Sequence, residues 1–114
     1  GHALEMAKGA QLTACIDAAA LPLLPGIQTF AEQGVAPGAA GRNWAASGEH
    51  VVLGEHISAS QRAVLTDPQT SGGLLVSCRP EVAAQVLEIF ARHGFGAARV
   101  IGTMQTGPAQ VQVQ

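Results

Sequence analysis

The chain has 114 residues, which fits a single domain over 1–114 that can bury roughly two thirds of its unfolded surface. Hydrophobic residues make up 47% of the sequence and charged residues only 12%, about half the ~25% usual in soluble domains. Such a weakly charged surface is expected when part of it lies against another domain or subunit, and equally in an alanine-rich sequence from a composition-biased genome. The six Lys and Arg residues are spread singly over a chain of net charge −2, so the sequence offers no basic patch for nucleic acid.

The sequence also lacks the signals of a membrane or secreted protein. No apolar run approaches the ~20 residues of a membrane span, and no basic region followed by a hydrophobic stretch opens the chain. We therefore expect a cytoplasmic protein without membrane contacts. Cys15 and Cys78 each sit in an apolar segment and are predicted to be buried reduced thiols, with a disulfide as the open alternative.

Apolar spacing and punctuation by Gly and Pro predict short elements in the first two thirds of the chain. In chain order these are a helix over 2–8, a strand over 13–17, a helix over 26–33, a short helix through 43–46, a strand over 50–53 and a helix over 58–65. Gly34 and Gly48 are the expected stops of the second and third helices, with a Gly- and Pro-rich loop over 34–41. Ser58 or Ser60 is the expected N-cap of the last helix. The first helix begins without an N-cap residue, which indicates a start inside a longer polypeptide.

The last third of the chain carries the clearest pattern. The continuous apolar run Gly73–Cys78 predicts a buried strand, and Pro80–His93 predicts an amphipathic helix with Gly94 as its stop. Further strands are expected over 99–103 and 111–113.

The helix predicted over 80–93 determines the expected packing. Its apolar stripe includes Val82, Val86, Ile89 and Phe90. This stripe is expected to cover a sheet that contains Leu74–Cys78 and Val100–Ile101, with Phe90 in the core. Strands separated by helices predict an α/β (α+β) fold, a two-layer sandwich of a mixed sheet covered by helices.

The segment Asp67–Leu75 is the most informative stretch for function. Pro68 favours an extended conformation at Asp67, so the preceding helix ends there. The two hydroxyls and two glycines that follow can aim backbone N–H groups at an anion, or they can form a tight turn that launches the next strand and binds nothing. No Lys-Ser/Thr pair opens a helix after the glycines, which excludes a Walker-type phosphate loop. The candidate phosphate-facing residues are Thr70, Ser71, Gly72 and Gly73.

The other polar residues give weaker signals. Asn43 with Arg42 is the best of them, since Arg can hold phosphate oxygens, although a helix cap beside a solvent-facing Arg explains the pair as well. Glu5 and Asp17 form a weak candidate pair of carboxylates for magnesium. The four histidines are too dispersed for metal-ligand spacing: His2, His50, His56 and His93. No catalytic or metal-binding residue is predicted in this chain.

The nonapeptide Asp67–Leu75 resembles the characteristic C-terminal-domain motif of selenophosphate synthetases (selenide, water dikinases). Three further segments match that family in order and spacing: Gly1–Ala7, Leu21–Gly26 and Arg42-Asn43. The resemblance covers essentially the whole chain. It implies the aminoimidazole ribonucleotide synthetase-like superfamily, whose members join an N-terminal dimerising domain to a C-terminal α/β domain.

The resemblance also implies a chemistry and a division of labour. The full enzymes of this family use ATP, selenide and water, with Mg²⁺, to make selenophosphate, AMP and phosphate. Their reactive Cys or selenocysteine, lysine and metal-binding aspartates belong to the N-terminal part or lie just ahead of Gly1. We therefore expect this chain alone to be inactive and to bind neither ATP nor Mg²⁺. Its expected partner is the N-terminal domain of the same chain, in a homodimer.

Two alternatives stay open. A sister enzyme of the superfamily, acting in purine biosynthesis or hydrogenase maturation, would share the fold, although the nonapeptide argues against it. A stand-alone interaction or structural domain would also lack catalytic residues.

Overall fold

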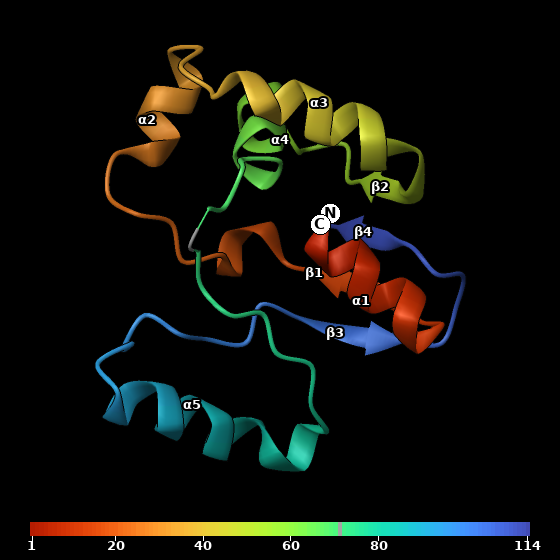
Figure 1. Cartoon of the computed structure of the whole chain (residues 1–114), viewed down its shortest axis with the longest axis vertical. Coiled ribbons are helices and arrows are strands. Elements are labelled where there is room, and N and C mark those ends of the chain that lie inside the picture. Colours follow the sequence, from red (N-terminus) through yellow and green to blue (C-terminus); the bar gives the residue numbers. More distant parts are fainter. Residues whose placement is uncertain (71) are drawn as a thin grey trace.

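The structure, a computed structural model, describes residues 1–70 and 72–114 and places them in a mixed four-stranded sheet accompanied by helices (Figure 1). The helices are α1 (His2–Ala10), α2 (Ile27–Glu32), α3 (Gly38–Ser47), α4 (Ala59–Leu65) and α5 (Ala83–Arg92). The strands are β1 (Thr13–Ile16), β2 (Val51–Leu53), β3 (Gly102–Gln105) and β4 (Val111–Val113). Short 3-10 turns span Ala18–Ala20, Gly48–His50 and Pro80–Val82. The α+β class and the mixed sheet predicted from the sequence are confirmed.

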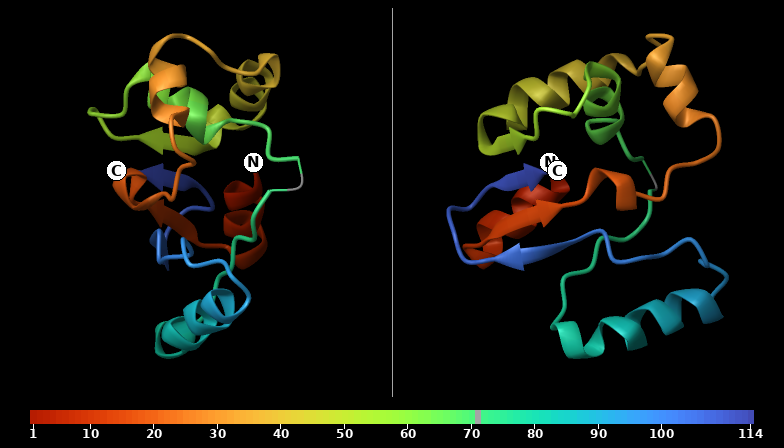
Figure 2. Two further views of the ribbon diagram at one scale, coloured as in Figure 1. Left: turned by 90° about the vertical axis from the view of Figure 1, so that its left-hand side faces the viewer. Right: turned by 180° about the vertical axis from the view of Figure 1, so that it is seen from behind.

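The sheet has the strand order β2-β4-β1-β3, so its two central strands come from opposite ends of the chain. β4 runs parallel to both β1 and β2, whereas β3 runs antiparallel to β1. In β1, Cys15 is paired with Gln112 of β4 and with Thr103 of β3. β3 is therefore one edge of the sheet, and it is the edge nearest α5 (Figures 1 and 2).

The core lies between α1 and one face of the sheet. Leu4 and Ala7 of α1 pack against Ala14, Val111 and Val113, and the three strand residues are each exposed by 5% or less. Ala14 belongs to β1, and the two valines are two residues apart in β4. Alternate residues of a strand share a face, which is why Val111 and Val113 both point at the helix. α2, α3 and α4 form a separate layer beyond the β2 edge (Figure 1).

Several helices begin or end at the capping residues that the sequence predicts. Gly34 and Gly94 follow α2 and α5 with φ angles of 79° and 86°, the left-handed conformation that glycine adopts without a steric penalty. At the start of α4, the Ser58 hydroxyl accepts the Gln61 N–H at 3.2 Å, and the Gln61 side chain accepts the Ser58 N–H at 2.8 Å. This reciprocal capping box identifies Ser58 rather than Ser60 as the N-cap.

Two helix boundaries differ from the prediction. α3 begins at Gly38, inside the predicted loop, because the extended Pro37 serves as its N-cap and an Ala-rich run follows. α1 continues through Gly9 to Ala10 and ends at Gln11, whose φ of 55° is left-handed. The Gln11 side chain supports this turn by donating its amide to the Lys8 carbonyl at 2.8 Å.

The predicted strand over Gly73–Cys78 is wrong. Leu74 and Val76 are 80% and 48% exposed, and no strand forms in this segment. The reason lies in the register of the neighbouring pair. β1 ends at Ile16 opposite Gly102, and the chain then enters the Ala18–Ala20 turn, so the strand predicted over 99–103 starts only at 102. The free edge nearest to residues 73–78 is therefore the four-residue β3, and the strand pairing does not extend to them.

The predicted packing of the last helix is also wrong. A helix does form over the Pro80–Val82 turn and α5, but it lies beyond the β3 edge rather than on the sheet (Figures 1 and 2). Phe90 is half-buried instead of fully buried. Its ring meets Phe95 edge-to-face with a centroid distance of 6.3 Å, so the helix end packs on its own C-terminal turn.

The predicted burial of the two thiols is corrected as well, whereas both are free as predicted. Cys15 is half-buried, Cys78 is exposed, and both are free, so they form no disulfide with each other. Among the helices of the described residues, none combines the length and the apolar character that a membrane crossing requires.

Candidate functional site

The candidate site begins at Thr66, the C-cap of α4. The Thr66 N–H donates to the Arg62 carbonyl at 3.1 Å, and its hydroxyl donates to the same oxygen at 2.9 Å. These bonds satisfy the last turn of the helix, whose final carbonyls have no partner within the helix. Pro68 then prevents the helix from continuing, since it disfavours helical geometry at Asp67.

The described part of the loop folds back on itself. The Gln69 side-chain amide donates to the Asp67 carboxylate at 2.7 Å, and the Gly72 N–H donates to the Gln69 carbonyl at 3.4 Å. A Cβ added at Gly72 would lie 2.9 Å from the Gln69 Cβ, so this position requires glycine. A Cβ at Gly73 would meet no atom of this chain within 4 Å.

Three of the four candidate loop residues are exposed to solvent: Thr70, Gly72 and Gly73. Ser71, the other candidate, lies outside the described residues. The exposed Thr70 hydroxyl is therefore available to a ligand or a neighbouring domain.

Asn43 is brought to the root of this loop, and Arg42 is not. The Asn43 side-chain amide donates to the Thr66 carbonyl at 2.8 Å, across 23 positions in sequence. The Arg42 guanidinium donates to the Gly38 carbonyl one turn back on its own helix, at 3.4 Å, and is exposed. Adjacent helix residues point about 100° apart, which separates the two side chains.

A second contact joins α3 to α4 beside Asn43. The Arg62 guanidinium carbon lies 5.0 Å from the ring centroid of Trp44, a cation–π geometry. Arg62 and Thr66 were not predicted as part of the site. Thr66 directly precedes the informative nonapeptide and carries a hydroxyl, which is a signal available in the sequence; Arg62 has none that distinguishes it from other surface cations.

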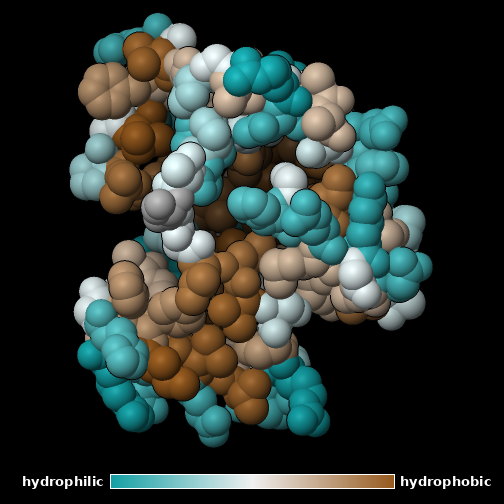
Figure 3. Space-filling view, in the orientation of Figure 1, coloured by the Kyte–Doolittle hydropathy of each residue, from teal (hydrophilic) through white to brown (hydrophobic). Residues whose placement is uncertain are grey.

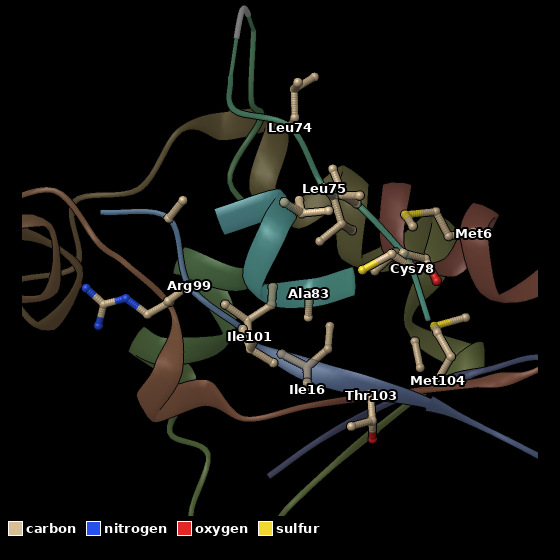
Figure 4. Close-up of a pocket in the computed structure, with 18 of the residues that line it drawn as sticks. Met6, Ile16, Leu74, Leu75, Cys78, Ala83, Arg99, Ile101, Thr103 and Met104 are labelled. Carbon is tan, nitrogen blue, oxygen red and sulfur yellow. The ribbon is translucent and has the colours of Figure 1, made fainter. Parts of the chain in front are cut away.

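An apolar groove starts where the loop ends. It has a volume of about 640 Å³ and lies between α5, the segment after the loop and the β3 side of the sheet. Leu74, Leu75 and Cys78 line it from the segment, and Met6 and Met104 from α1 and β3 (Figure 4). The Arg99 guanidinium points away from it (Figure 4). Figure 3 shows apolar side chains gathered on this face. The groove is therefore suited to binding an apolar surface of a partner rather than a phosphate.

The described residues form no metal centre. Over 1–70 and 72–114, no group of three His, Cys, Asp or Glu side chains gathers closely enough to hold an ion. The site that the structure assembles is therefore a hydroxyl- and glycine-bearing loop, tied at its root to α3 and continued by an apolar groove.

Comparison with known proteins assigns the chain. The family model described as AIR synthase related protein, C-terminal domain, matches residues 1–114. Selenide, water dikinase from Pseudomonas straminea is 59% identical over 113 residues, which are 99% of this chain and 32% of that protein. The protein of the same name from Burkholderia orbicola (strain MC0-3) is 55% identical, and the one from Rhizobium meliloti (strain 1021) 46% identical, with the same coverage.

The chain spans about a third of the length of these curated relatives. The resemblance first read from Asp67–Leu75 is confirmed, because the match extends over essentially all of the sequence. The chain belongs to the family of AIR synthase related protein C-terminal domains.

Proposed function

We propose that this chain is the C-terminal domain of a selenophosphate synthetase, a cytoplasmic enzyme that uses ATP, selenide and water to make selenophosphate, AMP and phosphate. The observation that carries the proposal is the 59% identity to a curated selenide, water dikinase over 99% of the chain. Domains of different activity in one superfamily rarely keep that level of identity through both core and surface.

In this proposal the chain supplies one wall of the active-site cleft. Phosphoryl transfer needs metal ions and cationic groups around the migrating phosphoryl group. ATP and Mg²⁺ are held by the rest of the polypeptide, which also forms the homodimer. The loop Thr70–Gly73 faces the cleft, where its hydroxyls and backbone N–H groups help to hold a phosphate or product anion. Arg42 and Asn43 flank this wall from α3.

The partner of the apolar groove is the remainder of the same polypeptide. The exposed Leu74 and Val76 side chains lie where a soluble monomer usually places polar groups, and the relatives are about three times as long as this chain. An apolar dye such as anilinonaphthalene sulfonate should therefore bind the isolated chain more strongly than a longer polypeptide that contains it. Equal weak binding to both would show that the groove closes within the chain and would overturn this partner.

The activity itself is tested with a matched pair of proteins. One is the 114-residue chain, and the other is a chimera in which this chain replaces the matching region of the Pseudomonas straminea protein. With ATP, Mg²⁺ and selenide, the chimera should release AMP and the isolated chain should release none above a no-protein control. AMP release by the chain alone, or a folded but inactive chimera, would overturn the proposal.

The part played by the loop is tested by Thr70→Val in the chimera. Valine keeps the shape of threonine and removes only the hydroxyl, and Thr70 is exposed. Selenophosphate formation should fall about tenfold, the effect of losing one hydrogen bond to a charged group, while the melting temperature stays within about 1 °C. Unchanged turnover would remove the hydroxyl from the mechanism. A parallel fall in turnover and melting temperature would mean that the loop is only a structural turn.

A further inference from the structure

Thr66 is held at each of its polar atoms. Its N–H and its hydroxyl both donate to the Arg62 carbonyl, at 3.1 Å and 2.9 Å, and its own carbonyl accepts the Asn43 amide at 2.8 Å. The first two bonds lie within one turn of α4. The third bond comes from α3 and fixes Thr66 relative to a different helix.

The residues that follow Thr66 are held in turn by short-range contacts within the loop. Pro68 limits Asp67 to extended conformations, the Asp67 carboxylate accepts the Gln69 amide at 2.7 Å, and the Gln69 carbonyl accepts the Gly72 N–H at 3.4 Å. Among the hydrogen bonds made by the described residues 66–70 and 72–73, the Asn43 bond alone spans more than four positions. It is therefore the bond that sets where the loop sits relative to the neighbouring helix.

The helix that carries Asn43 is itself anchored at this point. Trp44, the next residue, lies half-buried under the Arg62 guanidinium at 5.0 Å. Two consecutive residues of α3 therefore contact α4. Trp44 packs against Arg62 on the side of α4, and Asn43 donates a hydrogen bond to Thr66 at its C-terminal end. A short polar side chain at 43 can then reach the Thr66 carbonyl without the helix moving.

We propose that Asn43 is a positioning residue, which holds the root of the Thr70–Gly73 loop through the Thr66 carbonyl instead of binding phosphate itself. The effect on catalysis rests on the proposed function, whereas the positioning of the loop does not. An Asn43 amide that is already used to hold the loop has one donor left for any other partner.

The positioning is tested in the 114-residue chain with Asn43→Asp, which keeps the shape and replaces the donating amide with a carboxylate. Gln11→Glu is the matched control: the Gln11 amide also donates to a backbone carbonyl at 2.8 Å, that of Lys8, and its replacement adds the same charge in the turn after α1. In an amide NMR spectrum, Asn43→Asp should shift the Gln69 and Gly72 signals and the control should leave them in place. Unshifted Gln69 and Gly72 amides in Asn43→Asp would overturn the inference, whatever happens to activity.

The catalytic consequence is tested in the chimera. Asn43→Asp should lower turnover about tenfold with the KM for ATP within about twofold, because a displaced loop impairs the reacting geometry rather than ATP binding. Asn43→Gln, which keeps an amide donor, should recover most of the turnover, and the control Gln11→Glu should lose none. A rise in the KM for ATP with unchanged turnover would make Asn43 a ligand and overturn the inference. Shifted loop amides with unchanged kinetics would support the positioning and instead refute the proposed part of the loop in catalysis.

Discussion

Replacing Gly102 with Ala should destabilise the fold by about 3 kcal/mol, because the new methyl group has no space and its neighbours cannot move aside. Gly102 opens β3 opposite Ile16 in the antiparallel pair. A Cβ there would overlap the Cys15 carbonyl oxygen and lie 3.0 Å from the Ile16 Cα. Both are backbone atoms of β1, a central strand, so relief requires opening the β1–β3 pair.

Gly96→Ala is the matched control, since a Cβ at Gly96 would meet no atom within 4 Å. Its free energy of unfolding should stay within about 0.5 kcal/mol of the parent. Urea denaturation measures both variants. Hydrogen exchange adds a local readout, because the Asp17 N–H donates to the Ile101 carbonyl at 2.9 Å beside the strained pair and should exchange faster in Gly102→Ala. Equal urea midpoints for the two variants would contradict this description of the sheet edge.

The parts of the fold that were predicted from sequence are those that neighbouring residues determine. The capping box at Ser58 acts over three residues, and the left-handed turns at Gly34 and Gly94 act within one helix turn. The strands β2 and β4 were also predicted, because short apolar runs flanked by turn residues have few other places in a small fold.

The parts that were not predicted depend on partners far away in sequence. Whether Gly73–Cys78 forms a strand depends on pairing with a free edge, and the nearest free edge is β3, which is only four residues long. The apolar pattern of one segment carries no information about the length of the strand with which it would have to pair. The predicted burial of Phe90 is wrong because it assumed a sheet that contains Leu74–Cys78 as a strand, and that strand does not form.

The candidate site divides in the same way. The loop residues were chosen from the sequence because two hydroxyls and two glycines can aim backbone N–H groups at an anion. Asn43 was chosen with Arg42, because an arginine can hold phosphate oxygens. The bond from Asn43 to the Thr66 carbonyl was not foreseen, since it depends on how α3 packs on α4. Arg42 shows the converse: its charge favoured a phosphate role, while its guanidinium reaches only to Gly38 on its own helix.

The core identified by the structure gives the second large effect. Leu4→Ala should cost about 3 kcal/mol, because Leu4 is 6% exposed and its removal leaves a cavity between α1 and the sheet. Leu24→Ala is the control, since Leu24 is 74% exposed and its truncation should change stability by less than about 0.5 kcal/mol. Urea denaturation of the two variants measures the difference.

Phe90→Ala distinguishes this core from the one that the sequence alone suggested. A Phe90 buried between a helix and a sheet would cost about 3–5 kcal/mol on truncation, more than Leu4. The half-buried Phe90 of the structure loses mainly its edge-to-face contact with Phe95 and part of its apolar burial, which together amount to about 1 kcal/mol. Leu4→Ala should therefore lower the urea midpoint about three times as far as Phe90→Ala. If Phe90→Ala lowers the urea midpoint further than Leu4→Ala does, then α5 packs on the sheet in solution and the groove between them is closed.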